Sequence, residues 1–398
     1  MKKRIFIAIH YLEIGGAEIS LIGLLNAIDT TQYDVDLFLY SHRGELLKQV
    51  PNAIHLLPEI KKYDVIEKPI KEAIQKGFPD IALARLWAKY RFSRYARKNQ
   101  LKEGSAILQY VFDAVTPLLS DINPNTEYDL AISFLTPHNI VLNKVKAKKK
   151  LAWIHTDYTK ISVNVEKEIK VWSQFDYIVS ISEDVTRAFL SVFPTLAGKI
   201  IEIANILSPQ MVRQKALAVT VNYPTPKGRV NLLSVGRFTF AKNFDNVPDI
   251  CRRILQEGCD ICWYIVGYGG DESLIKEKIK EVGMEEHVIL LGKQENPYPF
   301  IKECDIYVQP SRFEGNAVTV REAQILCKPV IVANYPTAHS QIRQSVDGII
   351  VPQDNAGCAH GIAQFIKNKK LQQNIVRYLD EHDYGNEKEV QKLYHLMN

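Results

Sequence analysis

Cysteines and long apolar runs are scarce in this sequence. Its 398 residues include six cysteines, all in the second half, which is too few for a disulfide framework and fits a reducing compartment. No apolar run reaches about 18 residues without a charge, so no membrane span is predicted. The charged start Met1–Arg4 leads directly into a short strand-like run, which argues against a signal peptide. We therefore expect a cytoplasmic protein.

The cysteines offer no complete metal motif. Cys259 and Cys262 have the spacing of a metal or redox pair, but no second pair and no suitably spaced histidines accompany them. The pair runs directly into the apolar stretch Ile261–Val266. We interpret the two as ordinary thiols at the edge of a strand, and we predict no metal site.

Length and composition indicate a globular chain with two domains. With 46% hydrophobic and 24% charged residues, and ordinary glycine and proline contents, the chain is neither disordered nor a low-complexity or collagen-like repeat. A chain of 398 residues exceeds what one core holds, at about 100–200 residues per domain.

Short apolar runs alternate with amphipathic stretches of helical length along almost the whole chain. Because these runs are continuous rather than alternating, we expect strands covered on both faces, as in the parallel sheets of doubly wound α/β domains. The expected strands are Arg4–Tyr11, Asp34–Tyr40, Ala53–Leu57, Asp129–Leu135, Leu151–His155, Tyr177–Ser182, Ile200–Ala204, Val230–Val235, Cys262–Val266, His287–Leu291, Asp305–Gln309, Pro329–Ala333 and Gly348–Val351.

The polar, proline-containing stretch Ser208–Lys227 interrupts this rhythm and marks a domain boundary. We expect one Rossmann-like domain over residues 1–207 and a second over residues 208–375. Residues 376–398 are predicted to form short helices, separated at Gly385, that pack back on the first domain. Ligands of such folds bind at the carboxyl ends of the strands, facing a cleft.

Two loops that follow predicted strands carry groups suited to anions and sugars. Arg237 and Lys242 lie just after the first strand of the second domain, where a planar fork and a point charge are placed to hold a diphosphate. Glu314 follows a later strand in the same domain, and Glu322 lies near the second turn of the next helix. Carboxylates accept hydrogen bonds from sugar hydroxyls. By spacing alone, a retaining hydrolase with a carboxylate pair is also conceivable.

The first domain carries a glycine pair at the matching place. Gly15 and Gly16 lie between the first strand and a helix, where backbone amides can approach an anionic ligand closely. A purely structural tight turn has the same sequence, so the pair is weak evidence by itself.

Together these motifs resemble glycosyltransferase family 4, whose members are retaining, nucleotide-sugar-dependent enzymes of the GT-B fold. The resemblance covers nearly the whole chain and is most specific in the second domain. It is carried by Glu314-x7-Glu322, Gly236–Arg237 with Lys242–Asn243, Val266–Gly269, Gly15–Gly16 and Trp153–His155.

The resemblance implies a donor site in the second domain. Arg237 and Lys242 would bind the diphosphate, helped by backbone amides near Val318 and Thr319 and by Gly16. Glu322 would hold the ribose, and Glu314 would contact the transferred sugar and stabilise charge at its anomeric carbon. The remaining contacts implied are Gly315, Asn316 and Ala317 for the sugar, and Gly267, Lys293 and Gln294 for the base.

The resemblance also implies the acceptor side and the overall reaction. His155 corresponds to the family's histidine near the reacting sugar, and Glu314 and His155 would be the catalytic residues. The acceptor side would include Gly15, Gly16, Ser133 and His138. We expect transfer of a hexose, from a UDP-sugar in preference to other nucleotide sugars, to a saccharide or lipid-linked saccharide in cell-surface polysaccharide biosynthesis. Neither a metal nor another cofactor is expected, because cations and a helix start take the place of a divalent ion.

Two departures and two alternatives stay open. Asn316 and Ala317 are small where the family commonly has a bulky residue, and Phe244 has no role that the sequence assigns. An epimerase of the same fold would alter its nucleotide sugar without an acceptor. A non-catalytic subunit of this fold would be expected to lack one of the four charged residues Arg237, Lys242, Glu314 and Glu322, and all four are present.

The net charge of +5 comes almost entirely from the first domain. Residues 61–102 contain twelve cations and four acids, and Arg85–Lys98 interleaves cations with aromatics and contains no acid. One interpretation is a solvated helix packed on a core, and the other is a helix lying on an anionic membrane. No nucleic-acid-binding module accompanies it, so no nucleic-acid partner is expected. The second interpretation would make the protein peripheral on the inner face of the cell membrane.

Overall fold

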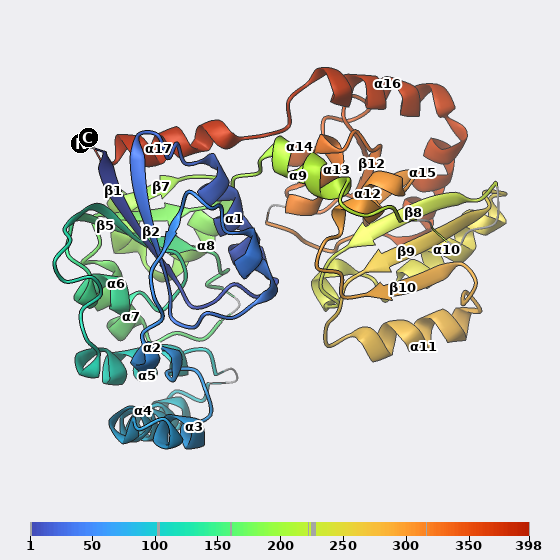
Figure 1. The fold of residues 1–398 in the computed structure, drawn as a ribbon. Helices are drawn as coiled ribbons and strands as arrows, with labels where there is room; N and C mark the ends of the chain where they lie inside the picture. Colours follow the sequence, from blue (N-terminus) through green and yellow to red (C-terminus); the bar gives the residue numbers. More distant parts are fainter. Residues whose placement is uncertain are drawn as a thin grey trace. The chain divides into compact units, whose positions relative to one another are not determined.

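The computed structural model describes residues 2–101, 104–159, 161–221, 223, 228–315 and 317–397. The chain forms two compact units, of which the first comprises Met1–Ile206 with Asn386–Asn398 and the second comprises Leu207–Gly385 (Figure 1). The chain therefore leaves the first unit and later returns to it. The tail expected as one piece, residues 376–398, is divided at Gly385, because the apolar side chains on the two sides of this point are buried in different units.

The first unit is a parallel sheet with helices packed on it. Its strands are β1 (Lys3–Ile9), β2 (Tyr33–Leu39), β3 (His55–Leu56), β4 (Tyr128–Ser133), β5 (Ala147–Ile154), β6 (Tyr177–Ser180) and β7 (Ile200–Glu202). Its helices are α1 (Gly16–Ala27), α2 (Lys61–Asp64), α3 (Ile70–Gln75), α4 (Pro79–Lys98), α5 (Ile107–Val115), α6 (Asn139–Lys144), α7 (Val165–Trp172), α8 (Glu183–Val192) and α17 (Val390–His395).

The strands of the first unit lie in the order β3-β2-β1-β4-β5-β6-β7, and every pairing between them is parallel. The central strand β1 is almost completely buried from Ile5 onward, as its continuous apolar sequence requires for a strand covered on both faces. One side of the sheet packs on an aromatic core that includes Phe6, Phe38, Phe112 and Trp172. The direction of the chain order reverses between β1 and β4, so the carboxyl ends of these two strands form the switch point of the unit.

The second unit repeats this architecture with fewer strands. Its strands are β8 (Val230–Val235), β9 (Ile261–Val266), β10 (Val288–Gly292), β11 (Ile306–Gln309), β12 (Val330–Ala333) and β13 (Ile349–Val351). Its helices are α9 (Pro209–Ala216), α10 (Val247–Gln256), α11 (Glu272–Val282), α12 (Tyr298–Glu303), α13 (Val318–Ile325), α14 (Ala338–Gln341), α15 (Asn355–Lys367) and α16 (Lys369–Glu381).

The strands of the second unit lie in the order β10-β9-β8-β11-β12-β13, and they also pair in parallel. Strand β9 is buried along its whole length, and the switch point lies between β8 and β11. Each of the thirteen strands expected from the sequence has its counterpart here. The expected fold class, two Rossmann-like parallel-sheet domains, is confirmed.

Candidate functional site

The second unit brings two of the predicted loops together at its switch point. Strand β8 ends at Val235, and the loop after it carries Arg237 and a short 3-10 turn, Phe240–Lys242. Strand β11 ends at Gln309, and its loop carries Glu314. The ammonium of Lys242 donates a hydrogen bond to Glu314 Oε1 over 2.6 Å, which joins the two loops.

Glu314 is held by three donors that all use the same oxygen. Besides Lys242, the Gln309 amide (3.0 Å) and the Ser311 hydroxyl (2.6 Å) donate to its Oε1. Its Oε2 has no hydrogen-bond partner in the described part of the chain, and 10% of the side chain is exposed. Gln309 is in turn fixed by the hydroxyls of Tyr307 and Thr319, which donate to its Oε1. The carboxylate is therefore fixed through one oxygen and offers the other to a ligand.

An arginine that the sequence did not single out clamps the two loops. Arg312 forms a bidentate ion pair with Asp245, at 2.9 and 2.7 Å, and donates to the Phe240 carbonyl over 2.7 Å. Its guanidinium also lies 4.1 Å from the centre of the Phe240 ring. Since Phe240 begins the turn that carries Lys242, this clamp sets the position of the lysine. An arginine after a strand is a common loop residue, so the sequence contains no signal for this pairing.

Arg237 is exposed and forms no hydrogen bond or ion pair with any residue that the structure describes. The next residue, Phe238, is buried and packs edge to face on Phe244, with ring centres 5.9 Å apart. Phe244 also lies against Gly236, where it approaches the position of an added Cβ to 3.4 Å. The role of Phe244, which the sequence left unassigned, is therefore to support the backbone on which Arg237 stands.

Glu322 differs from Glu314 in its surroundings. It lies in the second turn of α13, as predicted, but only 3% of it is exposed. The Tyr298 hydroxyl donates to its Oε1 over 2.8 Å. Burial raises the pKa of Glu322 to about 7, although the Tyr298 hydroxyl and the charge of Lys215 partly oppose this rise. Glu322, the residue predicted to bind the ribose, is therefore a buried carboxyl group that titrates near neutral pH.

The start of α13 lies beside this pair of carboxylates. Ala317 precedes the helix and donates its amide to Gln341 Oε1 over 3.2 Å, whereas Val318 and Thr319 are its first two residues. Gly315 is exposed, and Asn316, the remaining predicted sugar contact, lies outside the described residues. The first-turn amides of Val318 and Thr319 are the kind of donors that bind an anion at a helix start.

The predicted base contacts lie in the loops after β9 and β10. Gly267 is buried so close to the preceding loop that an added Cβ would stand 1.9 Å from the Gly236 carbonyl oxygen. Lys293 lies over the ring of Tyr268, 5.2 Å from its centre, and Gln294 donates to the Leu291 carbonyl. These residues follow neighbouring strands at the same edge of the sheet as Arg237.

In the first unit, three histidines lie at the carboxyl edge of the sheet. His10 follows β1, His138 follows β4 and His155 follows β5. Burial lowers the pKa of both His138 and His155 to about 3, and for His138 the neighbouring His10 and His155 add to the effect. The Nε2 atoms of all three are buried and have no hydrogen-bond partner in the described structure. Both predicted histidines are thus neutral imidazoles at neutral pH.

His10 is a candidate that the sequence analysis did not include. Its Nδ1 contacts Glu67 Oε1, and its ring packs on Tyr40 at 4.7 Å. Burial alone would raise the pKa of Glu67, but the charge and hydrogen bond of His10 bring it below its usual value. The pair is separated by 57 residues, so only the fold brings the two side chains together.

The other predicted acceptor residues surround the same edge. Ser133 ends β4, and its hydroxyl contacts His138 Nδ1 at 2.8 Å. Gly15 caps α1, and a Cβ added there would meet only the flexible end of Glu18. A Cβ added at Gly16 would meet nothing within 4 Å, so no neighbouring part of the described chain requires a glycine at this position.

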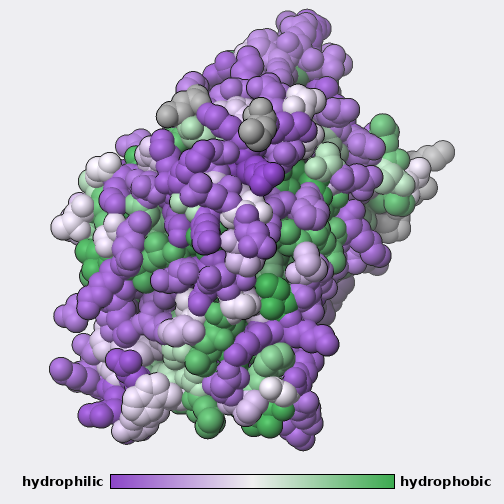
Figure 2. Space-filling view, turned by 60° about the vertical axis from the view of Figure 1, so that its left-hand side comes forward, coloured by the Kyte–Doolittle hydropathy of each residue, from purple (hydrophilic) through white to green (hydrophobic). Residues whose placement is uncertain are grey.

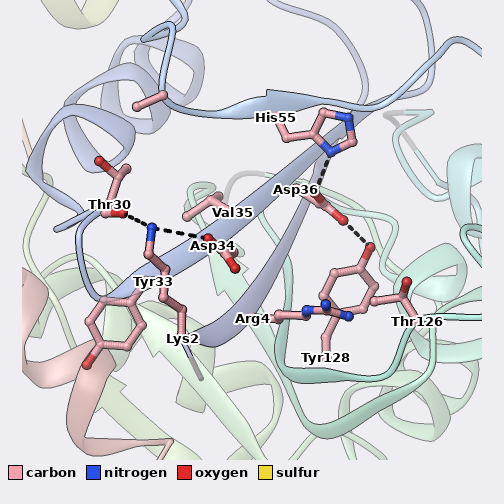
Figure 3. A pocket seen from close by; sticks show the side chains of 11 residues that line it. Lys2, Arg4, Thr30, Tyr33, Asp34, Val35, Asp36, His55, Thr126 and Tyr128 are labelled. Atoms are coloured by element: carbon pink, nitrogen blue, oxygen red, sulfur yellow. Dashed lines mark hydrogen bonds and ion pairs between the residues drawn. The ribbon is translucent and has the colours of Figure 1, made fainter.

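A cavity of about 500 Å³ lies at the opposite edge of the first sheet, among residues that begin β1, β2 and β4 (Figure 3). Its polar side chains satisfy one another: Asp36 binds both His55 and Tyr128, and Lys2 pairs with Asp34. Because ligands of doubly wound sheets bind at the carboxyl ends of the strands, this cavity is not the predicted site.

Cys259 and Cys262 are buried free thiols. Over the ranges that the structure describes, no group of three or more His, Cys, Asp or Glu side chains is placed to hold a metal ion. Within the same ranges, no helix combines the length and apolar character needed to cross a bilayer.

Comparison with known proteins shows that the second unit is similar to a family of glycosyltransferases. Residues 221–382 match the family model described as glycosyl transferases group 1. This segment contains Arg237, Lys242, Glu314 and Glu322, so the loops described above belong to a glycosyltransferase domain.

Two curated relatives share part of the sequence. The amylovoran biosynthesis glycosyltransferase AmsD of Erwinia amylovora is 27% identical over 170 residues, which is 42% of this chain and 48% of that protein. A Campylobacter jejuni N-acetylgalactosaminyltransferase, named for a diphospho-undecaprenol-linked acceptor, is 28% identical over 142 residues, 35% of this chain and 38% of that protein. The chain thus matches about half or less of the length of these relatives.

Solved structures show the same fold over the whole chain. TarM of Staphylococcus aureus, solved with fondaparinux, α-GlcNAc-glycerol and UDP, superposes with a TM-score of 0.66 at 14% identity, covering 100% of both chains. The fold of this protein is therefore GT-B, as the resemblance implied.

Proposed function

We propose that this protein is a retaining glycosyltransferase of family 4. It transfers a hexose-type sugar from a nucleotide diphosphate sugar, with UDP as the favoured nucleotide. The acceptor is a saccharide or a lipid-linked saccharide that is built into a cell-surface polysaccharide. The family match, the relative named for amylovoran biosynthesis and the UDP in the TarM structure support this proposal.

The contact between Lys242 and Glu314 is the observation on which the proposal depends. An ammonium has three donors, so Lys242 can bind Glu314 and a phosphate oxygen together. Arg237, free and exposed in the described structure, supplies a second cation for the diphosphate. Glu314 Oε2 is open toward a sugar hydroxyl or a developing positive charge. One site thus contains the charges for both halves of a nucleotide sugar.

The reaction follows from these charges. The bond between the anomeric carbon and the diphosphate oxygen breaks, and Arg237 and Lys242 stabilise the negative charge that builds on the leaving group. The acceptor oxygen attacks the same face of the sugar, and its proton passes to the departing phosphate oxygen. Glu314 acts electrostatically on the positive charge at the anomeric carbon. The configuration is therefore retained without a covalent enzyme intermediate.

The first unit supplies the acceptor side. His155 and His138 are neutral imidazoles, so they accept or donate hydrogen bonds to sugar hydroxyls without adding charge. Their unpartnered Nε2 atoms are the groups left to make such bonds. Gly16 is exposed and leaves its backbone accessible to phosphate and acceptor, whereas the Glu18 side chain lies against Gly15, the other predicted contact. Glu322 binds the ribose, and no metal or other cofactor takes part.

The test is nucleotide release from a panel of UDP-, GDP- and ADP-sugars, with and without a lipid extract as acceptor. Arg237→Ala and Lys242→Ala should each lower turnover by a factor of about 100 to 1000, as removal of a preorganised charge partner does. Lys280→Ala, which removes an exposed cation from α11, is the matched control and should leave turnover unchanged. Near-normal turnover in both site variants would overturn the assignment of the diphosphate site.

A further inference from the structure

Helix α4 of the first unit exposes a row of large apolar and aromatic side chains between Leu83 and Tyr90. Helix α4 buries Ile81, Ala82 and Ala88 against the unit. On the opposite side, four large side chains are exposed: Leu83 (66%), Leu86 (48%), Trp87 (57%) and Tyr90 (52%). Their spacing of three and four residues places them on one stripe of the helix.

Cations continue this stripe toward the end of α4. Arg91, Arg94, Arg97 and Lys98 are all exposed, and none of them forms an ion pair with another residue in the described ranges. The Arg94 guanidinium lies 6.0 Å from the centre of the Tyr90 ring, at the junction of the two halves. The one acid of the helix, Asp80, is already paired with Lys62. The exposed face therefore combines apolar and aromatic groups with uncompensated positive charge.

The neighbouring helix also carries an exposed apolar side chain. Helix α3 packs against α4, and its Ile74 is 53% exposed. Figure 2 shows hydrophobic (green) and intermediate (white) groups beside hydrophilic (purple) ones at the bottom of the view, the end at which Figure 1 places α3 and α4. An exposed apolar patch of this kind, rimmed by polar groups, marks a surface that binds something.

Charge complementarity favours one occupant. In a symmetric dimer through this face, the unpaired arginines of one copy would meet either the arginines or the apolar half of the other copy, and neither supplies a counter-charge. An anionic bilayer offers phosphate to the cations and an interface suited to tryptophan and tyrosine. The absence of acids on the outward stripe beyond Asp80 fits the same partner.

We propose that α4 lies on an anionic lipid surface, with Leu83, Leu86, Trp87 and Tyr90 inserted at the headgroup level and Arg91, Arg94, Arg97 and Lys98 bound to lipid phosphates. The proposal uses the proposed function only to explain why a lipid surface is useful, since a lipid-linked acceptor would be presented there. The binding itself needs no nucleotide sugar and no turnover.

Trp87 gives a direct probe of this contact. The chain has four tryptophans, and the other three, Trp153, Trp172 and Trp263, are buried. Vesicles of phosphatidylcholine with about 30% phosphatidylglycerol should shift the tryptophan emission to shorter wavelength and protect it from aqueous quenchers. The shift should be absent with phosphatidylcholine alone, and absent in Trp87→Phe.

The cationic half is tested by vesicle sedimentation at low salt. Replacing Arg91, Arg94 and Arg97 together by serine should weaken partitioning to the anionic vesicles about a hundredfold, since each basic residue near such a surface contributes about a factor of five. Raising the salt to about 0.5 M should weaken the wild type similarly. The matched control replaces three lysines of α11, Lys276, Lys278 and Lys280, which removes the same charge from the other unit and should have little effect.

The apolar half is tested with Leu83→Ser combined with Trp87→Ser. Its control is Leu217→Ser combined with Val219→Ser, two exposed apolar residues of the other unit. The first pair should lower partitioning at least about tenfold, and the second should not change it. Thermal unfolding of each variant shows that the fold is intact.

Two results would overturn the inference. One is no binding of the wild type to anionic vesicles at low salt, and the other is a wild-type dimer that the Leu83→Ser and Trp87→Ser pair dissociates. Binding to vesicles without any sugar transfer would support the lipid-binding surface and contradict the proposed function. Transfer to a soluble saccharide without vesicle binding would do the reverse.

Discussion

Glu314 and Glu322 have the same chemistry but different surroundings. Glu314 is held in place by hydrogen bonds from the Lys242 ammonium and from two neutral donors, and 10% of its side chain is exposed. Glu322 accepts a hydrogen bond from the Tyr298 hydroxyl and is buried. Their motif spacing is visible in the sequence, but their burial depends on helices α9 and α12, which pack beside α13. Burial therefore gives Glu322 a raised pKa.

The free energy of unfolding should depend on pH because of Glu322. Its folded pKa of about 7 lies above the ordinary value of 4.5, so the folded state favours the protonated form. The contribution of Glu322 to the free energy of unfolding is fully present below about pH 4.5. It falls by about 3 kcal/mol as the pH rises through 7. Glu322→Gln should lack this loss, which unfolding free energies measured from pH 5 to 8 will show. The exposed-carboxylate variant Glu272→Gln is the control, and an identical pH dependence in Glu322→Gln and the wild type would contradict the assignment.

His155 should act without titrating in the working pH range. Because burial lowers its pKa to about 3, the imidazole is neutral from pH 5 to 8. We expect His155→Ala to lower kcat without changing the shape of its pH profile, whereas His155→Gln, which keeps a hydrogen-bonding group, should recover part of the rate. An NMR resonance of His155 that titrates near pH 6.5 would refute this expectation.

At the scale of elements, the clamp around Arg312 should control the donor loop. The bidentate pair with Asp245 and the bond to the Phe240 carbonyl hold the turn that carries Lys242. Arg312→Lys keeps the charge but loses the planar fork, so we expect weaker donor binding, by about tenfold, with little change in global stability.

A double-mutant cycle of Arg312→Ala and Asp245→Ala, read out as donor affinity, should give a coupling of about 1–2 kcal/mol. Additive effects of the two substitutions would show that the clamp does not position Lys242. The control variant Arg252→Ala removes a partly exposed arginine that pairs with Asp249 within its own helix α10, and donor affinity should be unchanged.

The elements themselves could be predicted, but not the contacts that place the side chains. Continuous apolar runs fix a strand locally, which is why all thirteen strands were expected. The partners of Arg312 and His10 lie 67 and 57 residues away along the chain, and no local pattern encodes such pairings. Phe244 contacts Gly236 because the intervening turn places the Phe244 ring beside the end of β8. The local pattern therefore identifies candidate site residues, but it does not identify the residues that support them.

At the scale of the whole molecule, the C-terminal segment of the chain packs on the first unit. Helix α17 returns to this unit, where Leu393 is buried and Tyr394 stacks on Tyr33 with ring centres 4.2 Å apart. The Asp29 amide donates to the Tyr394 hydroxyl oxygen over 2.8 Å. Figure 1 shows this red helix beside the start of the blue strand β1. The sequence predicted a return to the first domain but placed its start ten residues too early, at 376, because α16 belongs to the second unit.

Removing residues 386–398 should therefore destabilise the first unit alone. Tyr394→Ala, which deletes the stacked ring and leaves the Asp29 amide without its acceptor, should cost about 3 kcal/mol. Hydrogen exchange is the measurement, because it reports each sheet separately: amides of β1 and β2 should lose protection, and those of β8 to β13 should keep it. Lys388→Ala, an exposed substitution in the same segment, should change neither. Equal loss of protection in both sheets would show that the returning segment stabilises the chain as a single cooperative body and not the first unit on its own.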